Sequence, residues 1–306
     1  MKALLTGAAG FIGANLAIYL NNKGWKIICI SKDISKRCLG LPGQKIDVPW
    51  VETPWKEVGQ VDVLIHHAAI TDTSCADKNK ILKKNVYDAI AFFNTALQHS
   101  CSRIVYASSM QVYGNATLPF KEDTTIEPLN LYAKSKRMLE VEATKLAQHY
   151  KNAVMIGLRY GNVYGPGEDH KGKMASMVTQ IGRQIILKDP VLYKYGEQKR
   201  DFIYITDVLE AIYASMQAKE SIILNIGSGK GISFNRIVEL FNNEFGTSRK
   251  PVYIDNPFAG KYQDEVILDI SLAKEKLGFK PDVPIELGIH QYVESCVFGK
   301  KELDNI

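Results

Sequence analysis

Apolar residues follow two alternating patterns through the first half of the chain. Short continuous apolar runs predict buried strands, which we place at residues 3–5, 26–30, 61–65, 103–107 and 154–158. Longer stretches with apolar residues on one face predict helices, which we place at residues 11–20, 81–99 and 132–150. Strands and helices that alternate in this way form a parallel sheet with helices on both faces. The predicted fold class is therefore α/β, with a doubly wound parallel sheet.

The pattern loosens after Gly165, where glycine and proline residues separate shorter apolar segments. Helical segments at 174–185 and 234–245 and a short strand at 252–254 predict a smaller α/β domain at the carboxyl edge of the sheet. The apolar run at 222–226 is expected to return to the main sheet. We therefore expect two domains, a larger one over 1–165 that is rejoined by about 201–226, and a smaller one over 166–200 and 227–306.

Composition and charge are those of an ordinary globular protein. The 306 residues leave room for a large core. The 38 basic and 33 acidic residues give a net charge of +5, which suits a small anionic substrate and does not favour nucleic acid as a partner. No apolar run approaches the ~20 residues of a membrane span. The first strand begins at once, so no signal peptide is visible, and we expect a cytoplasmic protein without a membrane partner.

The five cysteines, at positions 29, 38, 75, 101 and 296, are dispersed and lack CxxC spacing. An odd, dispersed set of cysteines is typical of the reducing cytosol. We therefore expect neither a disulfide framework nor a metal site.

A glycine-rich turn joins the first strand to the first helix. Gly7 allows a tight turn off the strand, Gly10 leaves room for a pyrophosphate, and Gly13 lets the helix lie close to the sheet. The N–H groups and positive dipole end of a helix N-terminus favour phosphate groups. An ordinary tight turn has a similar composition, but the position between a strand and a helix favours a dinucleotide-binding site.

Tyr132 and Lys136 stand four residues apart at the start of a predicted helix, so their side chains share one face. A tyrosine in water has a pKa of ~10, and a neighbouring ammonium favours the phenolate. We therefore expect Lys136 to lower the pKa of Tyr132 and to make the tyrosine a proton-transfer group. Because such pairs also occur on solvated helices, this interpretation depends on the residues around the pair.

Two serines lie at the end of the predicted strand at 103–107. Ser108 and Ser109 are placed at the edge of the sheet where ligands bind in this fold class. A hydroxyl group there can hydrogen-bond a sugar alcohol or the ketone derived from it. Serines also end strands simply as turn formers, so the interpretation gains its weight from Tyr132 and Lys136.

Seven motifs together carry a resemblance to a known family, and in chain order they span residues 6–13, 67–69, 107–114, 132–136, 158–166, 200–204 and 225–227. With these motifs the chain resembles the extended short-chain dehydrogenases/reductases that act on nucleotide sugars. The resemblance covers nearly the whole chain. It implies a Rossmann fold, a nicotinamide dinucleotide cofactor and a nucleotide-sugar substrate. The larger domain would then bind the dinucleotide and the smaller domain the substrate.

One branch of that family, the ADP-glycero-manno-heptose 6-epimerases, is especially similar. The similar segments are His170–Met177, Tyr195–Phe202 and Lys261–Gln263. This resemblance implies four catalytic residues, which are Ser109, Tyr132, Lys136 and a second lysine, Lys171. The chain departs from the branch at residues 264–269, where the family carries a Thr and then Ala-Asp, and its segment 31–60 is shorter than usual.

The resemblance also implies the residues that bind the two ligands. The cofactor-binding residues are Gly7, Gly10, Phe11, Ile12, Gly13, Ser31, Lys32, Asp47, Ala68, Ala69, Asn85, Tyr132 and Lys136. The substrate-binding residues are Ser108, Asn162, His170, Lys171, Arg200 and Tyr262. Arg200 and Asn162 are expected at the diphosphate, and the alternative for Arg200 is an internal ion pair with Asp201 or Glu197.

The end of the second strand favours NADP as the cofactor, with NAD as the alternative. Many NAD-binding relatives place an acidic residue there, which holds the ribose hydroxyls. This chain carries Ser31, followed by Lys32, Lys36 and Arg37. An acidic side chain would repel a 2′-phosphate, whereas a serine and nearby cations accept one. A solvated basic loop is the alternative interpretation of these residues.

The expected reaction inverts one sugar stereocentre through oxidation to a ketone and reduction from its other face. Tyr132 and Lys171 are the candidates for the two proton-transfer groups. Met110 and Gln111 stand where a 4,6-dehydratase carries an acidic pair, so epimerisation is favoured. A UDP-hexose 4-epimerase is the alternative enzyme, and a non-catalytic dinucleotide-binding regulator is the alternative of another class. The expected partners are the nucleotide sugar and further copies of the chain in a homo-oligomer.

Overall fold

The computed structural model describes residues 1–32, 34, 40–73, 75–256 and 263–295. Its main feature is a seven-stranded sheet in which every strand pair is parallel. From one edge to the other the strands are β10 (Ile222–Ile226), β6 (Val154–Tyr160), β5 (Arg103–Ser109), β4 (Val63–His66), β1 (Lys2–Thr6), β2 (Lys26–Ile30) and β3 (Gln44–Ile46). The strand order reverses between β1 and β4, and ligands of such sheets bind at the carboxyl ends of the strands there.

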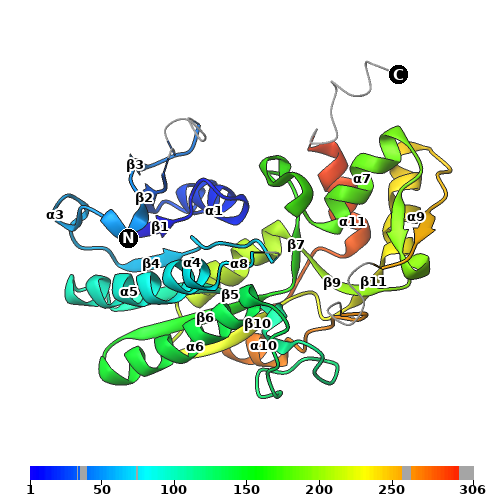
Figure 1. The fold of residues 1–306 in the computed structure, drawn as a ribbon. Helices are drawn as coiled ribbons and strands as arrows, with labels where there is room; N and C mark the ends of the chain where they lie inside the picture. The colour runs from blue at the N-terminus through cyan, green and yellow to red at the C-terminus, as the bar shows by residue number, and fades with distance from the viewer. Residues whose placement is uncertain (33, 35–39, 74, 257–262, 296–306) are drawn as a thin grey trace.

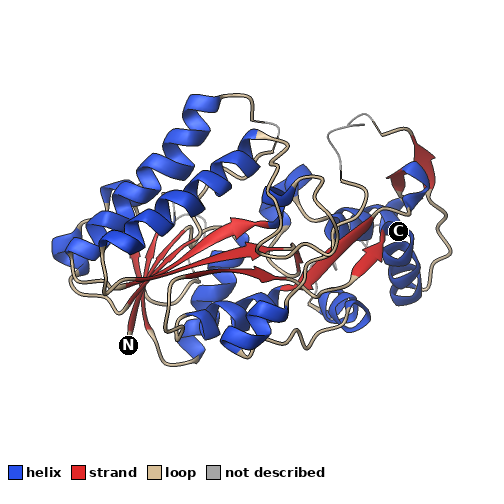
Figure 2. Cartoon of the chain, turned by 90° about the horizontal axis from the view of Figure 1, so that it is seen from below, coloured by secondary structure: helices blue, strands red, loops and turns tan. Residues whose placement is uncertain are grey.

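Helices cover both faces of this sheet, as Figure 2 shows. One face packs against α1 (Phe11–Asn22) and α8 (Ile205–Ser215), and α10 (Ser271–Leu277) lies beside β10. The other face packs against α5 (Asp88–Gln98) and α6 (Leu131–His149). Each face therefore has its own apolar core, and the predicted doubly wound α/β fold is confirmed.

The remaining elements lie to the right of the main sheet in Figure 1. They include a three-stranded sheet in the order β11 (Gly231–Ser233), β9 (Lys199–Tyr204), β7 (Asn162–Tyr164), and a pair formed by β8 (Val191–Tyr193) and β12 (Val252–Ile254). The helices of this part are α7 (Met177–Leu187), α9 (Phe234–Phe245) and α11 (Ile285–Glu294). Buried residues of α7, α9 and α11 join the same apolar core as those of α1 and α8, so this part packs continuously onto one face of the main sheet.

Most predicted elements of the main sheet occur where the apolar pattern places them. The strand at 222–226 returns to the sheet and pairs with β6, as expected. The helix predicted at 81–99 is interrupted: α4 (Lys78–Leu82) is followed by a π-helical turn at Lys83–Tyr87 and then by α5. In the segment 31–60, for which no helix was predicted, the structure has β3, a 3₁₀ turn at Trp50–Glu52 and the one-turn helix α3 (Trp55–Val58).

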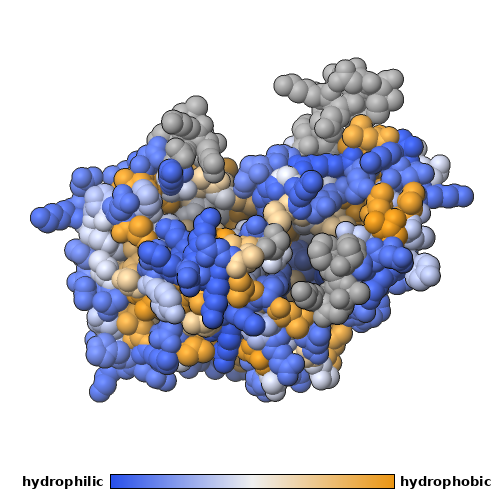
Figure 3. Space-filling view, in the orientation of Figure 1, coloured by the Kyte–Doolittle hydropathy of each residue, from blue (hydrophilic) through white to orange (hydrophobic). Residues whose placement is uncertain are grey.

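Several apolar side chains are exposed on the part of the chain that forms β8 and β12. Leu187, Val191, Val252 and Ile254 are all exposed and belong to α7, β8 and β12. Figure 3 shows orange side chains over this part of the molecule, at its right. Among the described helices, none is both long and apolar enough to cross a membrane.

Candidate functional site

The glycine turn after β1 is shaped by close backbone contacts. Gly7 has a φ of 72°, and a Cβ atom there would lie 2.7 Å from the backbone nitrogen of Ala68. A Cβ atom on Gly13 would collide with the carbonyl oxygen of Gly7. The first turn of α1 carries no acidic residue, and its N-cap residue Gly10 makes no side-chain hydrogen bond. The helix N-terminus is thus available to an anion, as a dinucleotide pyrophosphate requires.

Ser109, Tyr132 and Lys136 come together at the carboxyl end of β5. The Asn130 side chain caps α6 by accepting a hydrogen bond from the Ala133 N–H at 2.8 Å, which fixes the start of the helix. Lys136 Nζ donates to the carbonyl oxygen of Ala107 at 2.8 Å and lies 5.8 Å from the centre of the Tyr132 ring. Tyr132 also interacts through its hydroxyl with Ser109. The structure therefore assembles three of the four predicted catalytic residues into one group.

The pKa of Tyr132 shifts in the direction opposite to the one expected. Burial raises it to about 12, and the hydrogen-bonding interaction with Ser109 opposes this rise. Burial also lowers the pKa of Lys136 to about 8, against the attraction of Glu140. Both shifts have one cause, because taking a group out of water disfavours its charged form. The loss of water around the phenol therefore outweighs the hydrogen-bonding interaction with Ser109.

Ser108 lies on the α6 face of β5 and not beside Ser109. Its hydroxyl donates to Glu140 Oε1 at 2.6 Å, and the side chain is 3% exposed. Arg159 forms two hydrogen bonds with the same carboxylate, each 2.8 Å long. Neighbouring strand residues point to opposite faces, and Tyr106 shares the α6 face with Ser108. The hydroxyl expected to bind substrate is therefore held in a buried ionic network.

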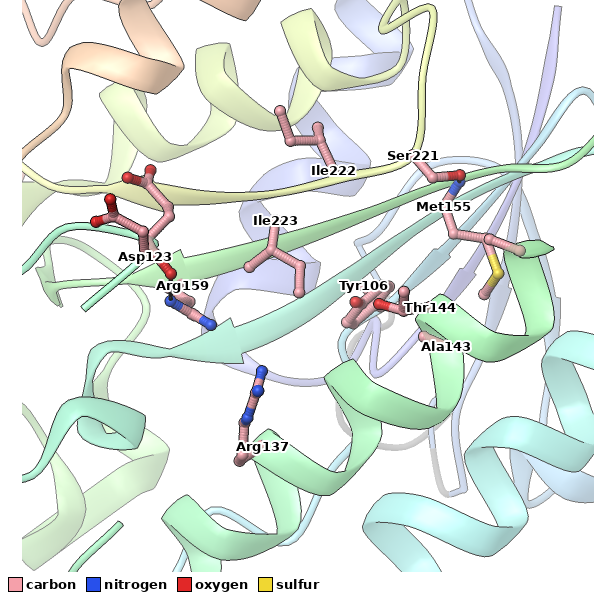
Figure 4. A pocket seen from close by; sticks show the side chains of 12 residues that line it. Tyr106, Asp123, Arg137, Ala143, Thr144, Met155, Arg159, Ser221, Ile222 and Ile223 are labelled. Carbon is pink, nitrogen blue, oxygen red and sulfur yellow. Dashed lines mark hydrogen bonds between the residues drawn. The ribbon is translucent and has the colours of Figure 1, made fainter. Parts of the chain in front are cut away.

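A groove of about 410 Å³ lies on the same face, between α6 and β10. Figure 4 shows Arg159 and Tyr106 on its floor, Arg137 and Thr144 on α6, and Ile223 on β10. The catalytic group of Ser109, Tyr132 and Lys136 does not line this groove.

Asn85 supports the loop after β4 from the π-helical turn. Its side chain accepts a hydrogen bond from the Ile70 N–H at 2.8 Å and donates to the Ile70 carbonyl at 2.9 Å. It also donates to Ser135 Oγ at 3.1 Å. The side chain predicted to bind the cofactor is therefore engaged with the protein, and it fixes the loop that carries Ala68 and Ala69, both half-buried.

Lys171 lies over the start of α1. Its Nζ is 5.1 Å from the centre of the Phe11 ring and 3.2 Å from Glu168 Oε2. Its neighbour His170 is exposed. Asn15 of α1 donates to the carbonyl oxygen of Pro166 at 3.0 Å, which ties α1 to the segment that carries Lys171. The fourth predicted catalytic residue therefore lies beside the glycine turn.

Arg200 is tied to the backbone. Its two terminal nitrogens donate to the carbonyl oxygens of Lys199, Gln263 and Asp264 at 2.6–3.1 Å. Glu197, one of the two carboxylates considered as its ion-pair partner, accepts a hydrogen bond from Asn235. The other, Asp201, accepts hydrogen bonds from Ser228, Gly229 and Leu268, and burial raises its pKa to about 6.

The residues expected near the adenosine side of the cofactor lie at the ends of β2 and β3. Ser31 is half-buried, whereas Lys32 and Asp47 are exposed; Ile12, at the start of α1, is half-buried. Lys36, Arg37 and the predicted substrate-binding residue Tyr262 lie outside the described residues.

Within the described part of the chain, several buried polar atoms have no hydrogen-bond partner, and two of them matter for the site. They are Nδ1 of His67 and Oδ1 of Asn162. His67 Nε2 pairs with the hydroxyl of Tyr160 at 2.9 Å, and burial lowers the pKa of the imidazole to about 3, so His67 is neutral. Unpaired buried polar atoms are costly. Together with the close-packed glycine turn, they fit a site for a dinucleotide and a polar substrate.

Residues 3–227 match the model of a family described as the NAD dependent epimerase/dehydratase family. The chain belongs to this family. As the resemblance of its motifs implied, it is an NAD(P)-dependent enzyme of the nucleotide-sugar epimerase/dehydratase superfamily.

Family members with different activities resemble the chain equally well. The ADP-L-glycero-D-manno-heptose-6-epimerase of Brachyspira hyodysenteriae is 32% identical over 95% of this chain and 96% of its own. The dTDP-4-dehydro-6-deoxyglucose reductase of Escherichia coli has the same identity, over 95% of this chain and 96% of its own. Overall sequence similarity therefore identifies the superfamily of this chain but does not identify its nucleotide-sugar substrate.

Solved structures of family members have the same fold. The ADP-L-glycero-D-manno-heptose-6-epimerase of Helicobacter pylori is 30% identical with a TM-score of 0.86, and the match covers 96% of this chain and 95% of that one. MoeE5, in complex with UDP-glucose and NAD, is 25% identical with a TM-score of 0.85, over 96% of this chain and 98% of its own.

Two acidic residues near the site were not singled out in the sequence. Glu168 stands three residues before Lys171, and Glu140 stands four residues after Lys136. Both spacings bring side chains together on a helical turn. Glu168 contacts Lys171, and Glu140 acts on the charge of Lys136. The spacing to each lysine was therefore the signal in the sequence that could have identified the two carboxylates.

Proposed function

We propose that this enzyme is a nucleotide-sugar epimerase, and specifically an ADP-glycero-manno-heptose 6-epimerase. The observation that carries the proposal is the position of Lys171 over Phe11, at the start of the dinucleotide turn. Lys171 lies in the His170–Met177 segment that resembles this branch of the family, and a second base is what distinguishes the branch. The mixed activities of the relatives make this residue more informative than overall identity.

In the proposed reaction, a nicotinamide dinucleotide held by residues 7–13 would supply the hydride chemistry that oxidises the alcohol carbon of the sugar to a ketone and reduces that ketone from its other face. Tyr132 removes or supplies the proton of the reacting oxygen, and Ser109 holds that oxygen through its hydroxyl. Lys136 orients Tyr132 and the cofactor ribose from its anchor on the Ala107 carbonyl. Lys171 serves as the proton-transfer group for the opposite face of the sugar.

We propose that the cofactor is NADP, bound by residues 7–13 and by the ends of β2 and β3. Two features support this preference. No acidic side chain stands at Ser31, directly after β2, and Lys32 beside it is exposed. A 2′-phosphate is attracted by such a cation and accepts a hydrogen bond from the serine.

We propose that the smaller domain, residues 166–200 and 227–306, binds the substrate through His170, Arg200 and Tyr262, with Asn162 of the larger domain beside them. The unpaired Asn162 Oδ1 supports a polar ligand there. The carbonyl contacts of Arg200 fix the guanidinium plane, and we propose that the guanidinium lies beside the diphosphate. We also propose a cytoplasmic homo-oligomer, which light scattering on the purified protein tests.

The second candidate is a UDP-hexose 4-epimerase. Ser109, Tyr132 and Lys136 would serve that reaction equally, and MoeE5 was solved with UDP-glucose. In that case Tyr132 acts alone and the sugar rotates between the two steps. A non-catalytic dinucleotide-binding regulator is disfavoured by the assembled catalytic group.

A substrate panel separates these candidates. The protein is incubated with NADP and, separately, with ADP-glycero-manno-heptose, UDP-glucose and UDP-N-acetylglucosamine, and the product epimers are resolved by anion-exchange chromatography and NMR. We expect inversion at C6 of the ADP-heptose alone. Inversion at C4 of a UDP-hexose alone supports the second candidate, and tight cofactor binding without any epimer supports the regulator.

A further inference from the structure

Glu168 is a fully buried carboxylate beside the second lysine of the site. It is 0% exposed. Its Oε2 accepts hydrogen bonds from the Ser176 N–H at 2.6 Å and from Lys171 Nζ at 3.2 Å. Its Oε1 is buried without a partner. A buried carboxylate is costly unless cations and hydrogen-bond donors compensate it, so Glu168 and Lys171 depend on each other.

The carboxylate is held rigidly by the start of α7. Ser176 is the N-cap of this eleven-residue helix, and its Oγ accepts a hydrogen bond from the Thr179 N–H at 3.2 Å. The Thr179 hydroxyl in turn bonds to the hydroxyl of Tyr292 at 2.8 Å. The N–H group that holds Glu168 therefore belongs to a capped helix end, where the helix dipole also favours a negative charge.

The backbone turns directly after Lys171, and two contacts direct the lysine side chain. Gly172 has a φ of 52° and no atom within 4 Å of an added Cβ, so the chain turns sharply directly after the lysine. The ammonium lies between the Glu168 carboxylate and the face of the Phe11 ring. A lysine side chain has several rotatable bonds, and these two contacts select the rotamers that point towards the dinucleotide turn.

We propose that Glu168 is a positioning residue that holds the Lys171 ammonium at the nucleotide-sugar site. This inference rests on the proposed function, in which Lys171 exchanges protons with the sugar oxygen. Glu168 touches neither substrate nor cofactor in this account. Its carboxylate fixes the direction in which the Lys171 side chain points, so that Nζ is held on the side of the dinucleotide turn.

Glu168→Gln tests the proposal, because the amide keeps the size of the side chain and can still accept from the Ser176 N–H. We expect kcat for epimerisation to fall about ten- to hundredfold while KM stays within about twofold. Glu168→Asp restores the charge and should recover part of kcat. Asp169→Asn is the matched control: Asp169 is the next residue, pairs with Arg183 at 2.8 Å, and should leave kcat unchanged.

A double-mutant cycle excludes a merely structural role. In a Lys171→Met background, Glu168→Gln should cost no further activity, whereas a residue that only supports the fold would cost the same in both backgrounds. Full activity of Glu168→Gln, or additive losses in the cycle, overturns the proposal. Thermal melting verifies that each variant is folded, and if Glu168→Gln is not, Glu168→Asp is carried through the same cycle.

A labelling experiment tests the same contact without any turnover. Acetic anhydride acylates amines that can reach it, so a lysine whose Nζ is held against a buried carboxylate reacts slowly. The folded full-length protein is labelled first and then digested for mass spectrometry. Lys171 should be acetylated about fivefold faster in Glu168→Gln than in the unaltered protein. The exposed Lys173 serves as the internal reference. An unchanged rate overturns the proposal. If the unaltered enzyme converts no nucleotide sugar, the proposed function fails, while labelling still decides the role of Glu168.

Discussion

Burial is the strongest influence on the proton-carrying side chains of the site. It raises the pKa of Tyr132 to about 12 and lowers that of Lys136 to about 8. At neutral pH the free site therefore holds a neutral phenol beside a lysine that is close to losing its proton. A cationic nicotinamide beside Tyr132 would favour the phenolate, so the site depends on its cofactor to form the base.

Tyr132→Phe and Lys171→Met should each abolish most epimerisation, because each change removes a proton-transfer group and keeps most of the side chain's volume. General acid–base groups typically contribute ~10²–10⁴-fold, so losses of that size are expected. An analogue with an aldehyde at the reacting carbon sharpens the test. Two aldehydes can disproportionate without inversion of any centre, so each variant should lose more epimerisation than disproportionation. Full epimerase activity of Lys171→Met would contradict the role of Lys171 and would support a mechanism in which Tyr132 is the single base.

Lys136→Met should change how stability depends on pH. The folded pKa of about 8 lies below the ordinary 10.5, so the unfolded chain binds more protons on this side chain between these pH values. The free energy of unfolding of the natural protein should therefore rise with pH in this window relative to the variant, by up to about 3 kcal/mol. Urea unfolding at several pH values measures the difference, and a difference that stays constant from pH 8 to 10 contradicts the burial of Lys136.

At the scale of elements, β5 and α6 are joined by a buried ionic network. Glu140 of α6 accepts hydrogen bonds from Ser108 and Arg159, and Arg159 also donates to the hydroxyl of Tyr113 at 2.8 Å. Tyr113 donates to Asn225 at 2.7 Å. The network thus connects β5, β6 and β10 to the helix that carries Tyr132 and Lys136, and it fixes the helix against the sheet.

Glu140→Ala should destabilise the fold by about 3–5 kcal/mol, because it leaves the Arg159 guanidinium buried without its carboxylate. Glu142→Ala is the control on the same helix. Glu142 pairs with Lys145 at 2.7 Å, but both side chains are exposed, so its loss should cost less than about 1 kcal/mol. Equal losses in denaturant unfolding would show that the buried network does not hold α6.

The elements that could be predicted are those whose pattern of apolar residues lies within one short stretch of sequence. Six strands of the main sheet contain a continuous apolar run, so they were visible in the sequence, whereas β3 contains Gln44 and Lys45 beside a single apolar residue and was missed. The short strands β9 and β11 pair through residues far apart in the sequence, such as Gly231 with Asp201, and no local pattern predicts that contact. The π-helical turn in the predicted helix at 81–99 was missed because it leaves the apolar periodicity nearly intact.

Ser109, Tyr132 and Lys136, for which a motif fixes both residue type and position, lie together as expected. Ser108 was placed at the substrate although the two-residue period of a strand points it to the other face. The direction of the shift in the pKa of Tyr132 was predicted wrongly. The i, i+4 spacing shows which charge is nearby, but it does not show how far burial removes water from the phenol.

At the scale of the whole molecule, cofactor binding should stabilise the fold, because α1, β4 and the segment of Lys171 all meet at the dinucleotide turn. NADP should raise the melting temperature by several degrees at about 100 times its Kd, and NAD at equal concentration by less. Ser31→Asp should reverse this order, since a carboxylate repels the 2′-phosphate and holds the ribose hydroxyls. An equal or larger shift with NAD in the natural protein would contradict the proposed preference.

The central claim is that one sugar carbon is oxidised and then reduced from its other face within a single site. It is tested most directly with ADP-glycero-manno-heptose that carries deuterium at C6, incubated with the enzyme in ordinary water and followed by NMR and mass spectrometry. The account predicts that the inverted product keeps its deuterium at C6, because the hydrogen leaves and returns through the bound cofactor. Inversion with loss of deuterium to the solvent, or no inversion at C6, would contradict it.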